Sequence, residues 1–274
     1  QWEEVKKKLR SKNKIVVAQF APSIRVSIGE EFGMSQGKIV TDQVVGALKR
    51  LGFDHVFDVN FGADVTTMVE AKELLERLET GKGLPMMTSC CPGWVKYVEF
   101  YYPHLVPNLT TSRSPHIHLG GIIKTYWAKK MGISPSKIEV VSVMPCTAKK
   151  FESVRPELKV QGRLPVDNVI TTREFAWILK KNRIDLKEVE KVKADNPLAQ
   201  YSGAGAIYGG TGGVMESALR TADHLARPKN KRKGKQEIEF KQVRGEGDIK
   251  EAEVQVGGEN LRVGVVNGVG NAPE

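Results

Sequence analysis

Short apolar runs alternate along most of the chain with longer segments of helical periodicity. Continuous apolar runs bounded by turn residues are typical of buried strands, and apolar residues spaced three and four apart indicate amphipathic helices. Helices are expected at residues 26–32, 41–51, 64–78, 93–100, 115–131 and 172–181, and at 214–225 after a glycine-rich turn. Strands are predicted at Ile15–Phe20, His55–Val59, Leu84–Ser89, Ile138–Met144 and Asn168–Thr171.

Strands that alternate with helices imply a mostly parallel α/β sheet joined by right-handed crossovers. The C-terminal part differs, because residues 237–243 and 252–266 alternate apolar and polar positions with a period of two, as antiparallel strands do. We therefore predict an α/β fold with two lobes, residues 1–137 and 138–274. Each lobe would have a mostly parallel, twisted sheet flanked by helices, with the active site in the cleft between the lobes.

Three loops that follow predicted strands carry candidate chemistry. Ala21-Pro22-Ser23 comes after the first strand, the pair Cys90 and Cys91 after the third, and Cys146 after the fourth. Ligands of open α/β sheets bind beyond the carboxyl ends of the strands. We therefore expect these loops to converge on one site.

Composition narrows the class of protein. The chain has 274 residues, of which 40% are hydrophobic and 27% charged, as in an ordinary globular protein of one large domain or two lobes. It shows no signal-peptide pattern and no apolar run long enough to span a bilayer. Only three cysteines argue against a disulfide scaffold and for a reducing, cytoplasmic setting.

The net charge of +10 comes partly from two basic runs, at residues 6–14 and 229–235. The second run has no interleaved aromatic residues, so a solvated loop is the first interpretation and a surface for an acidic electron-transfer partner the second. A nucleic-acid groove ranks third, because no recognition motif accompanies the charge.

The cysteines themselves indicate a metal centre. Cys90 and Cys91 are adjacent within the segment TSCCPGW, and Cys146 lies within MPCTAKKFE. A single buried cysteine is often a small apolar filler, but two adjacent ones before a Pro-Gly turn are hard to explain by packing, and they cannot easily form a disulfide. Thiolates at loop tips favour iron–sulfur clusters, with one of the pair binding metal and the other facing a cavity.

These two segments resemble the first two signature motifs of the [FeFe]-hydrogenase catalytic domain. The resemblance covers nearly the whole chain and includes Ala21-Pro22-Ser23 with Arg25, residues 29–33, and the glycine-rich stretch 201–216. The family reversibly reduces protons to H2. It uses an H-cluster, in which a [4Fe–4S] cubane is joined through a cysteine to a di-iron centre with CO, cyanide and a bridging dithiolate.

The resemblance implies a role for each matching residue. Cys91 and Cys146 would be cubane ligands, Cys90 would pass protons to the amine of the di-iron ligand, and Lys149 would hold a cyanide by a charge-assisted hydrogen bond. Tyr208 stands where Phe is common in the family, and His116 stands where an amide is expected. The di-iron pocket would be lined by Ala21, Pro22, Ser23, Pro115, Met144, Tyr208 and Gly209.

A proton must also reach Cys90 from water. Glu70, Glu73 and Arg77 lie at i, i+3 and i+7 of one predicted helix and so share a face. Spacing alone favours an ordinary solvated charge stripe, whereas the resemblance implies a proton relay. In that relay Glu152 and Thr110, where a Ser hydroxyl is usual, would supply the steps nearer Cys90.

A cubane takes four cysteine ligands, and this sequence supplies two once Cys90 is assigned to proton transfer. The family places the others in a third motif, which the sequence does not reach. We therefore expect a fragment of a longer enzyme, one chain of a split enzyme, or a degenerate relative, and no hydrogen turnover by this chain alone. Its partners would be ferredoxin or another electron-transfer domain, and a further C-terminal segment or a second chain.

Three alternatives remain. A non-catalytic carrier or scaffold in cytosolic iron–sulfur assembly would need the ligand cysteine but not Cys90. A hydrogen sensor would be expected to have an altered relay or an altered Cys90. A dinucleotide-dependent α/β oxidoreductase is disfavoured, because the turn from Ser202 to Gly213 lacks the strict phosphate-binding fingerprint.

Overall fold

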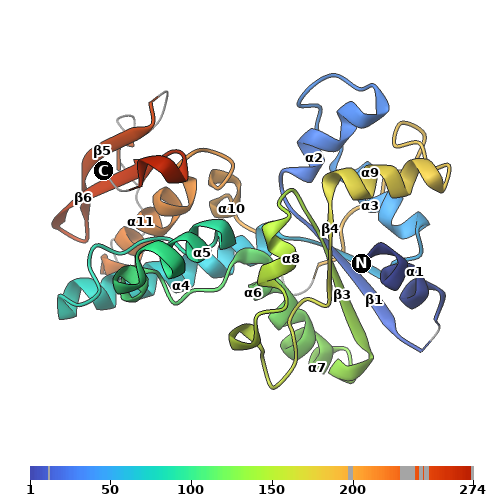
Figure 1. Ribbon diagram of the computed structural model, residues 1–274, viewed down its shortest axis with the longest axis horizontal. Helices are drawn as coiled ribbons and strands as arrows, with labels where there is room; N and C mark the ends of the chain where they lie inside the picture. Colours follow the sequence, from blue (N-terminus) through green and yellow to red (C-terminus); the bar gives the residue numbers. More distant parts are fainter. Residues whose placement is uncertain (12, 197–199, 229–237, 241–242, 244–246, 273–274) are drawn as a thin grey trace. The chain divides into compact units, whose positions relative to one another are not determined.

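Four of the predicted apolar runs form one parallel sheet in the computed structural model (Figure 1), which describes residues 1–11, 13–196, 200–228, 238–240, 243 and 247–272. The strands lie in the order β2-β1-β3-β4. Their bounds are β1 (Ile15–Phe20), β2 (His55–Asp58), β3 (Ile138–Met144) and β4 (Asn168–Thr171). The parallel α/β prediction is confirmed. All neighbouring strands pair in parallel, and the connections between them contain helices, which bring the chain back to the same end of the sheet.

By contact, the chain divides into two compact units. Unit 1 comprises residues 1–62 and 115–201, and unit 2 comprises residues 63–114 and 202–274. The single boundary expected between residues 137 and 138 falls inside unit 1, directly before β3. Because β3 pairs with β1, the two halves of unit 1 share one sheet despite their separation in sequence.

Helices pack against the sheet of unit 1 to form one apolar core. That core joins Val5, Phe20, Leu48, Phe57 and Phe175, among others, from strands and helices alike. The helices of unit 1 are α1 (Trp2–Arg10), α2 (Ile24–Ser27), η1 (Ile28–Phe32), α3 (Thr41–Arg50), α6 (Pro115–Ile122), the π-helix η3 (Ile123–Trp127), α7 (Ala128–Lys130), η4 (Pro135–Lys137), α8 (Ala148–Glu152), η5 (Pro156–Leu158) and α9 (Thr172–Lys181).

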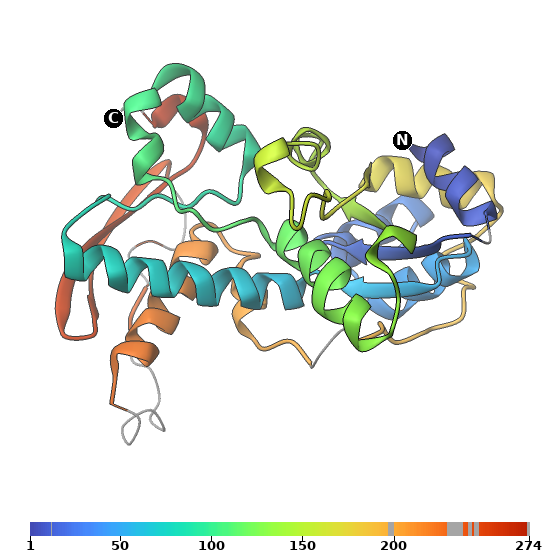
Figure 2. The same ribbon diagram turned by 90° about the horizontal axis from the view of Figure 1, so that it is seen from below.

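Unit 2 is built on the long helix α4 (Asn60–Thr80), which belongs to this unit from Ala63 onward and is seen along its length in Figure 2. Its apolar core joins α4, through Ala71 and Leu74, to α11 (Gly213–Ala226) and to an antiparallel hairpin. The hairpin strands are β5 (Ile249–Val256) and β6 (Glu259–Val266). Unit 2 also contains α5 (Pro92–Tyr101), η2 (Pro103–Asn108), α10 (Ala204–Ile207) and η8 (Val269–Asn271).

The antiparallel prediction for the tail is confirmed at 252–266, where Gly257 and Gly258 make the turn. Both glycines have positive φ, of 61° and 95°, as a tight two-residue hairpin turn requires. The predicted strand at 237–243 lies partly outside the described residues, and the described part of it forms no strand.

The strand predicted at Leu84–Ser89 is wrong. This segment belongs to unit 2, where Met87 forms a single isolated bridge with Leu109. Pro85 has no N–H to donate to a ladder and is disfavoured in a central strand. Cys90 and Cys91 therefore follow an irregular segment rather than a strand of the sheet.

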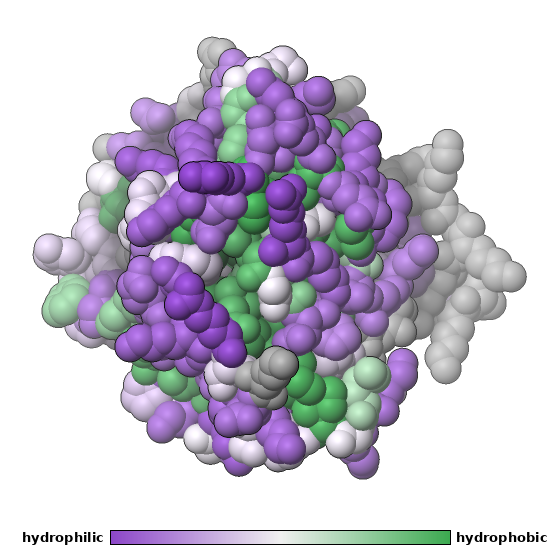
Figure 3. All heavy atoms as spheres, turned by 90° about the vertical axis from the view of Figure 1, so that its right-hand side faces the viewer, coloured by the Kyte–Doolittle hydropathy of each residue, from purple (hydrophilic) through white to green (hydrophobic). Residues whose placement is uncertain are grey.

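The surface is predominantly polar, with smaller apolar areas between charged side chains on the face that Figure 3 shows. Among the helices that the structure describes, none combines the length and apolar character needed to cross a membrane.

Candidate functional site

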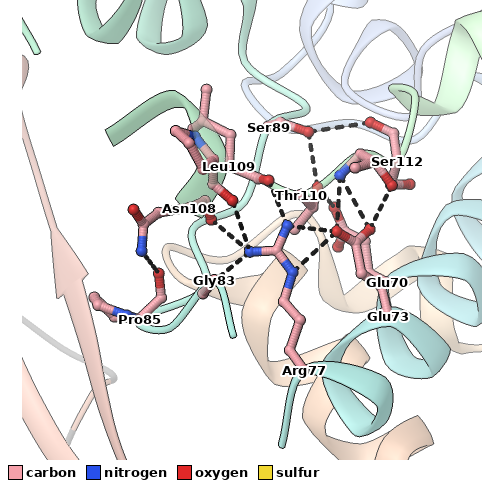
Figure 4. Close-up of polar contacts among 12 residues, drawn as sticks. Glu70, Glu73, Arg77, Gly83, Pro85, Ser89, Asn108, Leu109, Thr110 and Ser112 are labelled. Carbon is pink, nitrogen blue, oxygen red and sulfur yellow. Dashed lines mark hydrogen bonds and ion pairs between the residues drawn. The ribbon is translucent and has the colours of Figure 1, made fainter. Parts of the chain in front are cut away.

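Arg77 anchors a loop segment to one face of α4 in unit 2 (Figure 4). Its Nη2 donates to Glu73 Oε1 at 2.6 Å, and its Nε donates to the same oxygen at 3.1 Å. The guanidinium also donates to four carbonyl oxygens, of Gly83 at 2.6 Å, Pro107 at 3.3 Å, Asn108 at 3.1 Å and Leu109 at 2.7 Å. The predicted charge stripe is therefore a fixed, largely buried cluster rather than a solvated row.

Glu70 is the buried acid of this cluster. Its side chain has no exposed surface, Thr110 Oγ1 donates to its Oε1 at 3.2 Å, and its Oε2 has no hydrogen-bond partner among the described residues. The pKa of Glu70 is raised to about 7, mainly by burial and also by the charge of Glu73, while the Thr110 hydrogen bond opposes the rise. Near neutral pH, Glu70 can therefore both hold and release a proton.

A pair of hydroxyls, on Thr110 and Ser89, leads away from Glu70 in Figure 4. Thr110 Oγ1 lies 2.8 Å from Ser89 Oγ, and Ser89 also donates to the carbonyl of Ser112 at 3.1 Å. Ser89 directly precedes Cys90 in sequence. Sequence reasoning missed Ser89, although a hydroxyl beside the cysteine within the motif was the signal that could have identified it.

Tyr208 belongs to a second hydroxyl cluster in unit 2. Its Oη lies 3.0 Å from Thr67 Oγ1, which lies 3.0 Å from Ser217 Oγ. Burial raises the pKa of Tyr208, and the neighbouring acids Glu70 and Cys90 add to the rise. Tyr208 is therefore a neutral hydroxyl in this environment.

The glycine-rich turn is held by Asp64, which accepts from Ser202 Oγ at 2.9 Å and from Gly205 N at 3.1 Å. A Cβ on Gly213 would lie 1.9 Å from the Ile207 carbonyl oxygen, whereas one on Gly209 would meet nothing closer than 3.5 Å. Residue 213 must therefore be glycine, because the Ile207 carbonyl leaves no room for a side chain there. At Gly209 the surrounding atoms leave room for a side chain, so they do not explain why glycine is present. Its role in lining a cofactor pocket stays a prediction.

In unit 1 the loops after β1 and β3 lie at the same sheet edge. Ala21 N donates to Val143 O at 2.9 Å, and Arg25 Nε donates to Pro22 O at 3.0 Å while its Nη2 contacts both oxygens of Asp58. Two of the three predicted loops, Ala21-Pro22-Ser23 and the Met144–Cys146 segment, are thus brought together by parallel neighbouring strands.

Lys149 and Glu152 form an ion pair on α8, with Lys149 Nζ 2.8 Å from Glu152 Oε2. The same oxygen lies 2.6 Å from His116 Nε2. Burial would raise the pKa of Glu152, but the His116 hydrogen bond and the Lys149 charge lower it to about 2. Burial lowers the pKa of His116. At neutral pH the group is therefore an ionised Glu152 balanced by Lys149 beside a neutral imidazole.

Pro115 precedes His116 at the start of α6 and is held by close backbone packing. A Cβ on Gly62 would lie 2.1 Å from the Pro115 carbonyl oxygen, so only glycine fits there. A separate cavity of about 420 Å³ in unit 1, lined by Lys124, Lys129 and Gln161 among others, contains none of the predicted site residues.

The cysteines are the remaining members of the candidate site. None of them is in a disulfide; Cys91 is exposed, and Cys90 and Cys146 are half-buried. The pair lies in unit 2 and Cys146 in unit 1, so their convergence stays a prediction. Within the described part of the chain, no group of three or more His, Cys, Asp or Glu side chains is arranged to hold a metal ion.

The donor set fits an iron–sulfur group in kind, because accessible thiols outside any disulfide are the ligands that such clusters take. A [4Fe–4S] cluster takes four thiolates, and this chain offers two candidates, Cys91 and Cys146.

The family model and two similar proteins of known name point to the iron hydrogenases. The model for "Iron only hydrogenase large subunit, C-terminal domain" matches residues 14–274. Iron hydrogenase 1 of Clostridium pasteurianum is 47% identical over 98% of this chain and 46% of its own length. The periplasmic [Fe] hydrogenase large subunit of Nitratidesulfovibrio vulgaris is 44% identical over 97% of this chain and 62% of its own.

A solved structure of apo [FeFe]-hydrogenase HydA1 from Chlamydomonas reinhardtii has a TM-score of 0.83 and 38% identity, covering 99% of this chain and 76% of that one. At lower identity, the cytosolic Fe–S cluster assembly factor narfl of Danio rerio is 32% identical over 77% of this chain and 54% of its own length. The chain spans about half the length of two curated relatives that it matches, Iron hydrogenase 1 and an NADP-reducing hydrogenase subunit of Solidesulfovibrio fructosivorans.

Proposed function

The chain belongs to the family defined by the C-terminal domain of the large subunit of iron-only hydrogenases, and from that membership we propose that it is the catalytic part of an [FeFe]-hydrogenase. The reaction is the reversible reduction of protons to H2 with ferredoxin-type electrons. The observation that carries this proposal is Glu70, a fully buried carboxyl with a pKa of about 7 that accepts a hydrogen bond from Thr110, whose hydroxyl lies beside that of Ser89, the residue before Cys90.

The proton path begins at Glu73, whose side chain is 13% exposed, and continues through Glu70, Thr110 and Ser89. When Glu70 is ionised, Thr110 donates to it. When Glu70 carries a proton, it can donate to Thr110, which then donates to Ser89. Because each hydroxyl both donates and accepts, the row can reverse its direction after each proton passes. Glu152 stays in the proposal as a further relay member.

The H-cluster, when bound, supplies the redox chemistry at which protons and electrons combine. Cys91 and Cys146 would hold its cubane, and Lys149 would donate a hydrogen bond to a cyanide ligand. Cys90 would deliver the proton at the end of the relay. The pocket lining is proposed to be Ala21, Pro22, Ser23, Pro115, Met144, Tyr208 and Gly209.

The chain alone is proposed to be inactive, because it offers two of the four cubane thiolates. A further segment or a second chain would supply the others, and ferredoxin or another electron-transfer domain would supply electrons. We also propose a cytoplasmic location, on the ground that cysteine is scarce and unbridged. Fractionation of the source cells tests the location against the periplasmic one that a relative's name records.

Hydrogen evolution from a reduced dye tests the activity. The 274-residue chain, reconstituted with clusters, is compared with an extended form to which a C-terminal segment with two further cysteines has been added. Only the extended form should evolve hydrogen. Activity from the short chain would refute the ligand count.

In the extended form, Glu70→Gln keeps the shape but removes the proton carrier, so turnover should fall by about 10²-fold or more. Glu76→Gln is the matched control, because Glu76 is an exposed residue of the same helix and should leave turnover unchanged. Equal rates for wild type and Glu70→Gln would remove the relay from the proposal.

The second candidate is a role in cytosolic iron–sulfur assembly, which the 32% identical relative favours. A carrier of clusters has no evident use for a buried acid that titrates near neutral pH. Cluster transfer to an apo-acceptor without hydrogen turnover by the extended form would favour this candidate instead.

A further inference from the structure

Five polar side chains form a continuous row in unit 1, buried except for the partly exposed Lys149 at one end, and His116 is at its centre. Gln19 on β1 lies opposite Ser142 on β3 in the parallel register. Both are fully buried, and His116 is 1% exposed. His116 Nδ1 lies 3.1 Å from Ser142 Oγ, and its Nε2 lies 2.6 Å from Glu152 Oε2, which also accepts from Lys149.

The direction of the hydrogen bonds is fixed at the Gln19 end. One atom of the Gln19 amide lies 2.8 Å from the His116 carbonyl oxygen and 2.7 Å from Ser142 Oγ. A backbone carbonyl can only accept, so the amide atom facing it must be nitrogen. That nitrogen has two N–H groups, and the second donates to Ser142.

The hydroxyl of Ser142 has one proton, and it is directed at His116 Nδ1. The imidazole therefore accepts at Nδ1 and carries its own proton on Nε2, from which it donates to Glu152. The opposite tautomer would place an unprotonated Nε2 against a carboxylate oxygen at 2.6 Å, with two acceptors facing each other. A doubly protonated ring would place a second positive charge beside Lys149 in a buried site, which burial disfavours.

We propose that His116 is a positioning residue, locked as its Nε2–H tautomer by Gln19 and Ser142, that holds Glu152 and through it the ammonium of Lys149. The inference rests on the proposed function in one respect only, the proposed hydrogen bond from Lys149 to a cyanide ligand. The part of the row from Gln19 through Ser142 to His116 is excluded as a proton path, because its far end is a carboxamide, which does not take up or release protons in this pH range.

The arrangement predicts which substitutes can work. A glutamine at this position can offer one donor to Glu152 and one acceptor to Ser142, as the Nε2–H imidazole does. A phenylalanine keeps the ring but has neither group, so Glu152 loses the donor on the ring and Ser142 loses its acceptor. One contact that holds Glu152 in place would then be missing, and Lys149, which pairs with Glu152, would be held less firmly.

The first test is the ring tautomer of His116 in the full 274-residue chain, by long-range ¹H–¹⁵N NMR of histidine-labelled protein at pH 7. We expect a pyridine-type Nδ1 and a pyrrole-type Nε2, with the other four histidines as internal references. A protonated Nδ1, alone or together with Nε2, would overturn the proposal. This measurement uses the wild-type chain and needs no bound cluster.

The second test follows the Lys149 ammonium protons by ¹⁵N-lysine NMR in His116→Gln and His116→Phe, with circular dichroism to confirm folding. A role limited to packing would lower stability but leave the exchange of these protons unchanged. We expect exchange near the wild-type rate in His116→Gln, and exchange about tenfold faster or more in His116→Phe, as for loss of a hydrogen bond to a charged group. Equal exchange in all three proteins would contradict the positioning role.

The two proposals fail separately. A wrong tautomer removes the role of His116 and leaves the hydrogenase proposal standing. The expected tautomer in a protein whose extended form evolves no hydrogen would leave the positioning of Lys149 intact and remove its proposed purpose.

Discussion

The burial of Glu70 makes the stability of the protein depend on pH in a defined window. The pKa of Glu70 is about 7 in the folded protein against 4.5 for an ordinary glutamate. Between these values the unfolded chain has released the proton and the folded chain still holds it, so stability falls as pH rises from 4.5 to 7. At about 1.36 kcal/mol per pKa unit, the total loss is about 3 kcal/mol.

The perturbation that isolates this effect is Glu70→Gln, which cannot titrate at that position. Every other group titrates equally in the two proteins and cancels in the comparison. The free energy of unfolding of the variant, relative to wild type, should therefore rise by about 2 to 3 kcal/mol between pH 5 and pH 8. Urea unfolding followed by circular dichroism at several pH values measures it.

Glu76→Gln provides the control, since it makes the same substitution at an exposed position of the same helix and removes no buried carboxyl. Thr110→Ala gives an independent check of the sign. The Thr110 hydrogen bond lowers the pKa of Glu70, so its removal should move the loss of stability to higher pH. A constant difference between Glu70→Gln and wild type from pH 5 to pH 8 would refute the burial argument.

Three further predictions concern the turn, the loop anchor and the cluster ligands. Gly213→Ala should destabilise the protein by about 1–3 kcal/mol or more through the backbone clash at 1.9 Å, whereas Gly210→Ala, whose Cβ would meet nothing closer than 3.8 Å, should be close to neutral in urea unfolding. Arg77→Ala removes a donor shared by the Glu73 carboxylate and four carbonyls and should cost about 2–4 kcal/mol in the same assay; a loss below about 0.5 kcal/mol would show that the loop is anchored elsewhere. Cys146→Ser should lower the iron bound after anaerobic reconstitution, while Cys90→Ser should leave it unchanged; equal iron in both variants would contradict the assignment of ligands.

Local pattern was enough to place most of the elements. The strand bounds at Ile15–Phe20, Ile138–Met144 and Asn168–Thr171 agree with the structure, because short segments rich in β-branched apolar residues and bounded by turn residues favour buried strands. The helix predicted at 172–181 also agrees, and Thr171 and Glu174 form a capping box at its start. At Leu84–Ser89 the same reasoning failed, because hydrophobicity was weighed above the missing donor of Pro85.

The candidate site divides in the same way. Spacing placed Glu70, Glu73 and Arg77 on one helix face, but it could not show that Glu70 is fully buried while Glu73 reaches the surface. Ser89 was missed because its contact with Thr110 joins positions 21 residues apart, and no local pattern records such a pairing.

By itself, the sequence determined the α/β class, the family and the residue types available for chemistry, because periodicity and motifs are properties of neighbouring residues. The tertiary structure alone decided that two separated segments share the unit 1 sheet, that Glu70 is an acid titrating near pH 7, and that His116 contacts Glu152. These outcomes depend on which distant side chains exclude water from a group or reach it with a hydrogen bond. Desolvation and long-range contact are set by the folded arrangement, so chain order does not specify them residue by residue.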